Sequence, residues 1–312
     1  MPPEVIFADS QLAVETTRSL YPNGKQITTV DHGYDNIVVL VDQTYALRFP
    51  RNNGAFLRSQ YEKRVLANLV SMQEVTIPRV VGEHDNPPCL ITNFVSGNHI
   101  SIDEIRSWSA SSQVEFGTRI GRFAAQVHEL LSVDEARTLR KDLKLDEQQE
   151  EPWNVYFEKL FALNILTPEQ DRVAQQYFRE WQQLDTNPDV VLHDDLHSDN
   201  MLFEGEQLTG ILDFGDTNIG PPEEELRQLY WVNDTTLMAG VTAYEKLSNV
   251  HLNVQAIRVW AITHELSTYI KQLSNGKQNS QSFTRASSNL NRWFSTSVWG
   301  KGVVSANAIT EQ

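Results

Sequence analysis

The chain has 312 residues, of which 40% are hydrophobic and 9% aromatic, so it can fill the core of one large or two modest globular domains. Its single cysteine, Cys89, excludes an intramolecular disulfide and a thiolate metal cluster, and no apolar run reaches the ~20 residues that span a bilayer. The formal net charge of −15 argues against nucleic acid as a partner, because contacts to phosphate need Lys and Arg.

The N-terminal region predicts a small antiparallel sheet. It begins without the basic and apolar segments of a signal peptide, so we expect a cytoplasmic protein. After a short helix within residues 1–20, the hydrophobic pattern changes to a period of two. We expect five strands around one helix at 55–72, with the strands at 27–30, 37–41, 44–49, 77–81 and 90–95.

Several residues of this sheet are candidates for nucleotide binding. Ala46 and Arg48 share one face of the third strand, so a flat base fits over the small side chain while the cation reaches phosphates. Glu62 on the following helix is the candidate ion-pair partner of Arg48. Backbone N–H groups in the turn containing Gly33 and Asn36 are positioned for phosphate, and the chain at Asn93 and Val95 for the edge of an adenine.

Beyond residue 98 the pattern becomes helical. Helices are expected at 112–131, 153–166, 168–184, 223–231 and 256–273, the third opened by a capping box of Thr167 and Gln170. The charged stretch 135–151 is poorly periodic and predicts a linker or a mobile insertion. We therefore expect an α+β fold with a nucleotide-binding lobe at 1–95 and a larger, mainly helical lobe at 96–312, joined by a hinge at 96–98.

The strongest motif is the stretch H-D-D-L-H-S-D-N, which ends at Asn200 and is followed by D-F-G-D from Asp213. Two short apolar runs between them flank a turn at Gly205, which predicts a β-hairpin. If the hairpin places Asn200 opposite Ile211, then Asp213 lies diagonally off it at roughly 7–8 Å. An amide oxygen and a carboxylate at that separation suit one Mg²⁺ ion.

The same stretch contains a candidate catalytic base. Asp195 precedes Asn200 by five positions, as the base precedes the metal ligand in the H-R-D-x-x-x-x-N loop of kinases. The chain from Asp216 to the next predicted helix is too short for an activation segment that docks a protein substrate. The motif therefore favours phosphoryl transfer to a small molecule.

Acidic residues concentrate around this motif. Residues 189–226 contain eleven Asp or Glu and no Lys or Arg, which favours a divalent metal and a cationic acceptor. The candidate acceptor-binding residues are Asp194, Asp199, Asp216, Glu223, Glu224, Trp231 and Glu265.

Taken together, the motifs resemble the aminoglycoside phosphotransferase family, which includes macrolide, choline, fructosamine and homoserine kinases. The resemblance covers most of the chain and rests on H-x-D-L-H-x-x-N from His193, I-L-D-F-G-D from Ile211 and Y-A-L-R-F-P from Tyr45. It implies a protein-kinase-like, two-lobed fold. The roles that it implies are a catalytic base at Asp195, Mg²⁺ ligands at Asn200 and Asp213, a phosphate contact at Arg48 paired with Glu62, and support of the loop by His193 and His197.

Four positions depart from the family pattern. Asp194 replaces a glycine, Ser198-Asp199 replaces Pro-Gly, and Pro221 stands where an aspartate often follows the glycine. Arg48 replaces a lysine, which keeps the charge but presents a bulkier, forked group and can change the nucleotide preference. None of the four removes a catalytic group.

The expected function is transfer of the γ-phosphoryl of Mg²⁺-bound ATP or GTP to a hydroxyl, with an aminoglycoside as the preferred acceptor and a monomer or weak dimer as the active species. Another hydroxylated metabolite or a macrolide is an alternative acceptor. A nucleotide-binding pseudokinase with a regulatory role is a second alternative, suggested by Arg48 and the sparse glycine loop. A third is a carboxylate metallohydrolase that uses Asp195, Asp213 and Asp216, against which the strand containing Arg48 argues.

Overall fold

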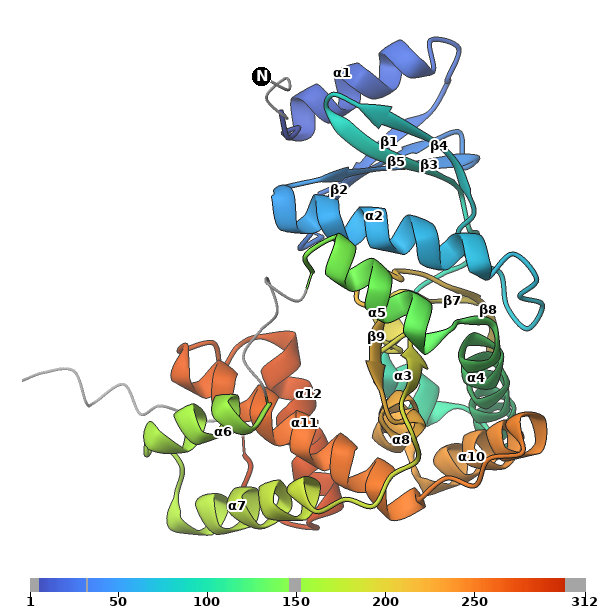
Figure 1. Ribbon diagram of the computed structural model, residues 1–312. Coiled ribbons are helices and arrows are strands. Elements are labelled where there is room, and N and C mark those ends of the chain that lie inside the picture. The colour runs from blue at the N-terminus through green and yellow to red at the C-terminus, as the bar shows by residue number, and fades with distance from the viewer. Residues whose placement is uncertain (1–5, 32, 146–152, 301–312) are drawn as a thin grey trace, which may run out of the picture. The chain divides into compact units, whose positions relative to one another are not determined.

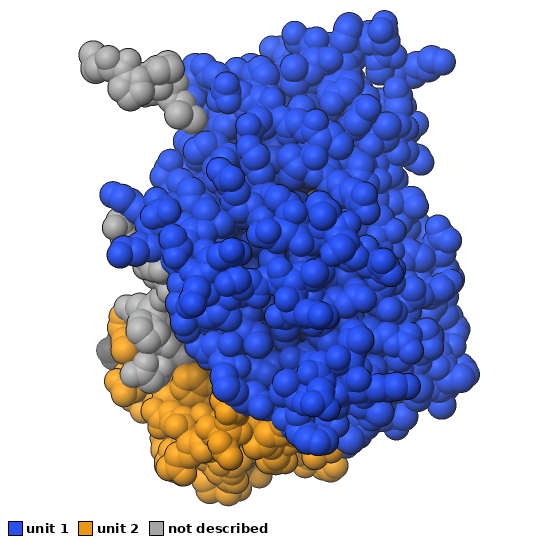
Figure 2. Space-filling model, turned by 45° about the vertical axis from the view of Figure 1, so that its right-hand side comes forward, with its two compact units in different colours: residues 1–149, 187–252 blue, residues 150–186, 253–312 orange. Residues whose placement is uncertain are grey.

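The computed structural model describes residues 6–31, 33–145 and 153–300 (Figure 1). The chain forms two compact units, residues 1–149 with 187–252 and residues 150–186 with 253–312 (Figure 2). None of the described helices combines the length and apolar character needed to cross a membrane.

The N-terminal part of the first unit is the expected antiparallel sheet of five strands. Its order is β1-β2-β3-β5-β4, with bounds β1 Ile27–Val30, β2 Asn36–Val41, β3 Tyr45–Pro50, β4 Val80–Asp85 and β5 Pro88–Asn93. Helix α1 (Ser10–Leu20) covers one face of this sheet and α2 (Asn53–Asn68) the other (Figure 1). Leu47 and Phe49 of β3 are buried in a cluster with Ala13 of α1. The alternation of the strand therefore turns Ala46 and Arg48 to the opposite face.

The rest of the first unit combines helices with two short strand pairs. Helices α4 (Ala110–Leu130) and α10 (Asp234–Ser248) pack closely because glycines line their contact, and a Cβ at Gly121 would lie 2.0 Å from the carbonyl oxygen of Gly240. The strand pairs are β6 (Val190–Leu192) with β9 (Asn218–Gly220), and β7 (Met201–Glu204) with β8 (Gln207–Ile211). The remaining helices are α3 Ile102–Ser107, α5 Val133–Asp142, α8 Pro222–Glu225 and α9 Leu229–Val232.

Hydrogen bonds join the sheet region to the β7–β8 hairpin. The backbones of Asn98 and Phe203 exchange two hydrogen bonds of 2.9 Å, and Thr76 makes two more with the second hairpin strand. The expected lobe boundary at residues 95 and 96 thus lies inside the first compact unit. The assignment of nucleotide binding to residues 1–95 remains a prediction.

Three expected features of this unit were wrong in detail. The strand expected at 77–81 runs instead from Val80 to Asp85. Residues 135–142 of the predicted linker belong to α5, and residues 146–151 of that stretch lie outside the described residues. The single helix expected at 223–231 is divided into α8, a 3₁₀ turn at Leu226–Gln228 and α9.

The second unit is a helical bundle of α6 (Trp153–Ala162), α7 (Pro168–Gln182), α11 (Val254–Ser274) and α12 (Gln281–Trp293). The capping box of Thr167 and Gln170 is confirmed at the start of α7. Phe157 stacks on Phe178 with ring centroids 4.6 Å apart, which fixes α6 on α7. Helix α12 was not predicted, because polar residues dominate its sequence.

Candidate active site

A short buried strand delivers the H-D-D-L-H-S-D-N loop. His193 follows β6 and is fully buried, with its ring 4.6 Å from that of Phe214 and 6.0 Å from that of Phe123. Its Nε2 lies 3.0 Å from the carbonyl oxygen of Leu212, so Nε2 carries the hydrogen. Nδ1 then accepts the N–H of Asp195 at 3.3 Å. The His193 ring therefore connects the loop to the chain that precedes Asp213.

Asp195 is oriented by hydrogen bonds to both of its carboxylate oxygens. His197 Nε2 lies 3.1 Å from Oδ1, and Asn200 Nδ2 donates to Oδ2 at 2.8 Å. Burial alone would raise the pKa of Asp195, but the hydrogen bond and charge of His197 outweigh it and lower that pKa below its usual range. The side chain is 33% exposed, so an ionised carboxylate faces solvent in a fixed orientation.

The β7–β8 hairpin differs from the expected register by one residue. Phe203 faces Leu208 as expected, but a bulge follows, and Met201 rather than Asn200 faces Ile211. The backbone carbonyl of Asn200 instead accepts the N–H of Leu212 at 2.8 Å. The prediction was wrong because the extra residue, Thr209, leaves no signal in the hydrophobic alternation. The bulge brings Asn200 level with the residue that precedes Asp213.

Asp213 lies beside the Arg48–Glu62 pair. Arg48 Nη1 is ion-paired with Glu62, and its Nη2 donates to Asp213 Oδ1 at 3.0 Å. Glu62 is only 1% exposed and also accepts the N–H of Phe214 at 3.3 Å. Burial would lower the pKa of Arg48, but the two carboxylates raise it instead, which keeps the guanidinium charged. Burial raises the pKa of Glu62, and the charge of Arg48 opposes that shift.

The donor set around Asp213 fits a magnesium ion that keeps sites for water and phosphate. The amide nitrogen of Asn200 is engaged by Asp195, which directs its amide oxygen away from that carboxylate. Asp213 is 44% exposed, and only its Oδ1 accepts from Arg48. Within the described ranges, no three His, Cys, Asp or Glu side chains are grouped to hold a metal. One carboxylate and one amide oxygen match Mg²⁺, which proteins commonly bind through few side chains together with substrate phosphates.

Arginines fix the turn between β1 and β2. Arg58 of α2 donates from Nε and Nη2 to both oxygens of Asp35, at 2.6 and 2.5 Å, and Arg51 Nε donates to the carbonyl of Gly33 at 3.0 Å. A Cβ at Gly33 would lie 2.9 Å from the carbonyl of Asn36, so the turn requires glycine there. The Oδ1 atom of Asn36 is buried without a hydrogen-bond partner among the described residues. Sequence reasoning missed Arg58, although it lies one helical turn before Glu62.

The adenine-edge candidates lie at the end of β5. The side chain of Asn93 accepts the N–H of Arg79 at 2.6 Å, which leaves the peptide of Asn93 fixed at the strand end. Val95 is 7% exposed, and Ala46 pairs with Thr92 across β3 and β5. Ala46 and its partner Thr92 lie on the face that carries Arg48, whereas Asn93 pairs with Tyr45 and lies on the opposite face.

Asp194 adopts a left-handed backbone conformation, with φ of 68°, and is held by buried charges. Arg227 Nη2 lies 2.9 Å from Asp194 Oδ1 and also donates to the Asp194 carbonyl. Glu225 accepts the N–H groups of His193 and Asp194 at 2.6 and 3.0 Å. Arg227 was not singled out from the sequence, and Glu225 was counted only among the acids expected to attract a cationic acceptor, because no local pattern links either residue to the loop.

The acceptor-binding candidates divide by exposure. Asp199 is 70% exposed and Asp216 is also exposed, so both offer carboxylates to a ligand. The other candidates in the first unit are buried or paired: Asp194 with Arg227, Glu223 with Asn187, Glu224 near Arg227, and Trp231 at 3% exposure. In the second unit, Glu265 is fully buried and lies 3.1 Å from Arg285 Nε.

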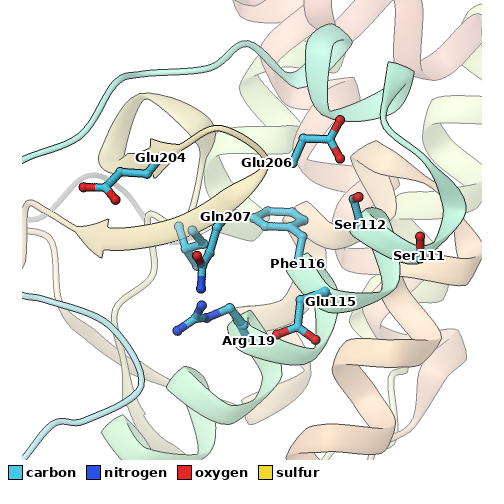
Figure 3. A pocket seen from close by; sticks show the side chains of 9 residues that line it. Ser111, Ser112, Glu115, Phe116, Arg119, Glu204, Glu206 and Gln207 are labelled. Carbon is cyan, nitrogen blue, oxygen red and sulfur yellow. The ribbon is translucent and has the colours of Figure 1, made fainter.

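A pocket of about 390 Å³ lies beside the turn of the β7–β8 hairpin, and Figure 3 shows the side chains that line it. Glu204 and Glu206 approach it from the hairpin, and Glu115 and Arg119 from α4. No residue of the H-D-D-L-H-S-D-N loop lines it. We therefore do not assign the acceptor to this pocket.

Comparison with known proteins identifies the family. Residues 26–249 match the model of the phosphotransferase enzyme family. No curated protein matches the chain. Among solved structures of the same fold, the GDP complex of wild-type aminoglycoside 2'-phosphotransferase-IIIa has 17% identity and a TM-score of 0.72, covering 91% of this chain and 98% of that one.

Two further structures give similar agreement. The macrolide 2'-phosphotransferase MphH from Brachybacterium faecium has 18% identity and a TM-score of 0.64, covering 89% of this chain and 98% of that one. The streptomycin–ATP complex of APH(2")-IIa has 19% identity and a TM-score of 0.62, covering 90% and 97%. The chain belongs to the phosphotransferase enzyme family and has the α+β, protein-kinase-like fold of the matched structures.

Proposed function

We propose that the protein transfers the γ-phosphoryl of ATP or GTP to a hydroxyl of a small molecule, with an aminoglycoside as the preferred acceptor. The observation that carries this proposal is the fixed orientation of the Asp195 carboxylate, which His197 and Asn200 hold by one oxygen each. The backbone carbonyl of Asn200 also accepts the N–H of Leu212, the residue before Asp213. A positioned carboxylate next to a Mg²⁺ site is the arrangement that phosphoryl transfer needs.

Each residue has a distinct role in the proposed reaction. Asp195 accepts a hydrogen bond from the acceptor hydroxyl, aligns it with the phosphorus atom and takes its proton late in the transfer. Arg48, held by Glu62, contacts the phosphates of the donor. Asn200 and Asp213 would hold Mg²⁺, which neutralises charge on the phosphate oxygens.

The donor and acceptor are proposed from charge and from the solved structures of similar fold. Those structures include complexes with GDP, with ATP and with streptomycin, which support a purine nucleotide donor and an aminoglycoside acceptor. The exposed carboxylates of Asp199 and Asp216 would attract an acceptor with several ammonium groups. We place the reaction in the cytoplasm, where nucleotide and Mg²⁺ are supplied, and propose a monomer or weak dimer.

Phosphorylation assays with Mg²⁺ and ATP or GTP test the proposal. The acceptor panel is streptomycin, kanamycin, a macrolide, choline and simple sugars, and the variants are Asp195→Ala and Asp103→Ala. Asp103 is an exposed carboxylate in α3 that pairs with Arg106 outside the site, so its loss should leave turnover unchanged. Turnover of an aminoglycoside that Asp195→Ala abolishes, with binding of Mg²⁺–ADP or Mg²⁺–GDP retained, is the expected result.

Other outcomes would change the proposal. Turnover of the macrolide alone would move the acceptor class, since similar folds include macrolide phosphotransferases. Full activity of Asp195→Ala would remove the proposed mechanism. Nucleotide binding without turnover of any acceptor would favour a pseudokinase. The contact between Arg48 and Asp213 is consistent with that outcome, because it occupies one oxygen of the carboxylate proposed to bind Mg²⁺.

A further inference from the structure

Arg140 is a buried cation in α5, in a stretch that the sequence predicted to be a linker. It is only 9% exposed, and a charged side chain at that burial requires close partners. Its Nη1 donates to the backbone carbonyl of Thr217 at 3.0 Å. Its guanidinium carbon lies 5.6 Å from the ring centroid of Tyr61 on α2, within the range of a cation–π contact. Arg140 therefore joins α2 to the chain that follows the D-F-G-D motif.

Both contacts of Arg140 adjoin residues of the proposed site. Tyr61 immediately precedes Glu62, which pairs with Arg48. Thr217 is fully buried and closes the turn of the motif, because its hydroxyl and its N–H donate to the carbonyl of Phe214 at 2.7 and 3.3 Å. The N–H of Phe214 in turn donates to Glu62 Oε1 at 3.3 Å.

These contacts form a closed ring. It runs from Arg140 through Thr217 and Phe214 to Glu62, and returns through the adjacent Tyr61 to the guanidinium. Within the ring, the contact between Glu62 and Phe214 is a single long hydrogen bond. Arg140 lies outside the site and contacts both segments that this bond connects, α2 at Tyr61 and the turn of the motif at Thr217.

We propose that Arg140 is a positioning residue for phosphoryl transfer, which holds Glu62 against Arg48 and keeps Asp213 in place by fixing the turn at Phe214. This inference rests on the proposed function. A guanidinium is required because its planar fork can donate to a carbonyl while its face lies on an aromatic ring, whereas an ammonium group lacks that geometry.

Helix α5 supplies a matched control. Arg137 lies one turn before Arg140, is 56% exposed, and pairs with Asp189 at 3.3 Å and with Asp134 at 3.9 Å. Removing it deletes a cation from the same helix and leaves the ring untouched. Arg137→Ala should therefore keep the wild-type activity.

The test compares Arg140→Met and Arg140→Lys with Arg137→Ala. We expect both Arg140 variants to lose about tenfold or more in kcat/KM for the nucleotide, with the acceptor KM unchanged. Hydrogen exchange of the amides of Phe214 and Thr217 should be faster in both Arg140 variants and unchanged in Arg137→Ala. Arg140→Lys keeps the charge and serves as the working variant if Arg140→Met does not fold.

A double-mutant cycle separates positioning from general stability. If Arg140 acts through Glu62, the loss on Arg140→Met becomes small in a Glu62→Gln background, whereas a purely structural role gives the same loss in both backgrounds. Equal losses, normal kcat/KM in both Arg140 variants, or unchanged exchange at Phe214 and Thr217 would each overturn the inference. Absence of nucleotide binding in the wild type would instead refute the proposed function, and the exchange experiment would still decide the role of Arg140.

Discussion

The pair of Asp194 and Arg227 offers the sharpest prediction about stability. Arg227→Met removes the cation while keeping much of the apolar volume. Asp194 then stays in a site where its side chain is only 20% exposed, without the partner that now lies 2.9 Å away. Burial already raises the pKa of Asp194, and the charge of Arg227 opposes that shift. Losing one partner of a buried ion pair costs about 3–5 kcal/mol, a large share of the ~5–15 kcal/mol by which proteins are stable.

Asp194→Gly is the informative companion change. It removes the nearest carboxylate of Arg227, but Glu224 Oε1 remains at 3.9 Å, and the guanidinium keeps its bonds to the carbonyls of residue 194 and of Glu224. Glycine also removes the strain of a left-handed φ of 68°, which is about 1–2 kcal/mol for an ordinary L-residue and less for aspartate. We therefore expect Asp194→Gly to cost less than Arg227→Met. We expect the double variant to be more stable than Arg227→Met alone, with a coupling of about 1 kcal/mol or more.

Urea denaturation followed by circular dichroism measures these differences. Hydrogen exchange over residues 193–200 assigns the loss to the loop rather than to the second compact unit. The reasoning fails if Arg227→Met lies within about 1 kcal/mol of the wild type, or if the losses of the two single variants simply add in the double variant.

Three further predictions concern the site and the helix packing. Arg48→Lys should raise the nucleotide KM several-fold, since one ammonium group cannot reach both Glu62 and Asp213 as the fork does; an unchanged KM would show that only the charge matters. Desolvation, together with the charges of Asp213 and other nearby acids, raises the pKa of Asp216 to about 7. The protonated Asp216 side chain therefore contributes stability below about pH 4, and this contribution is lost as the pH rises through 7. The melting temperature of Asp216→Asn minus that of the wild type should therefore be larger at pH 8 than at pH 5. Solvent screening of this exposed side chain limits the size of the effect. If the difference between the two melting temperatures does not depend on pH, the raised pKa of Asp216 is contradicted. Gly121→Ala should destabilise the protein by about 3 kcal/mol or more, because its methyl group would collide with the backbone of α10, and thermal unfolding near the wild-type midpoint would show that the helices can separate.

The parts of the fold that were predicted correctly from the sequence depend on local residue patterns. Alternation in β3 placed Arg48 on the face opposite Leu47, and helical spacing placed Glu62 within its reach, so their pairing was expected before any coordinates. The turn at Gly205 and the capping box at Thr167 have residue types that specify their geometry.

The features that were missed depend on contacts between distant segments. Arg140 contacts Thr217, which is 77 positions away in the sequence, and Arg227 contacts Asp194, which is 33 positions away. In the sequence, neither arginine can be distinguished from an ordinary exposed residue. The charged α5 was read as a linker because it buries only a narrow stripe, which includes Ala136 and Arg140. A hydrophobic pattern cannot report a helix whose main buried contact is made by a guanidinium.

The acidic stretch shows how burial changes the meaning of a charge count. From the sequence, all eleven acids of residues 189–226 counted toward attraction of a cationic acceptor. In the structure, Glu225 holds two N–H groups of the loop, Glu223 binds Asn187, and Asp194 is paired with Arg227. Because these charges are satisfied internally, the attraction of an acceptor falls to exposed carboxylates such as Asp199, with Asp216 adding a full charge only above about pH 7. Salt should then weaken acceptor binding only slightly, because it screens one or two exposed charges rather than eleven. The buried acids serve instead to hold the loop that orients Asp195.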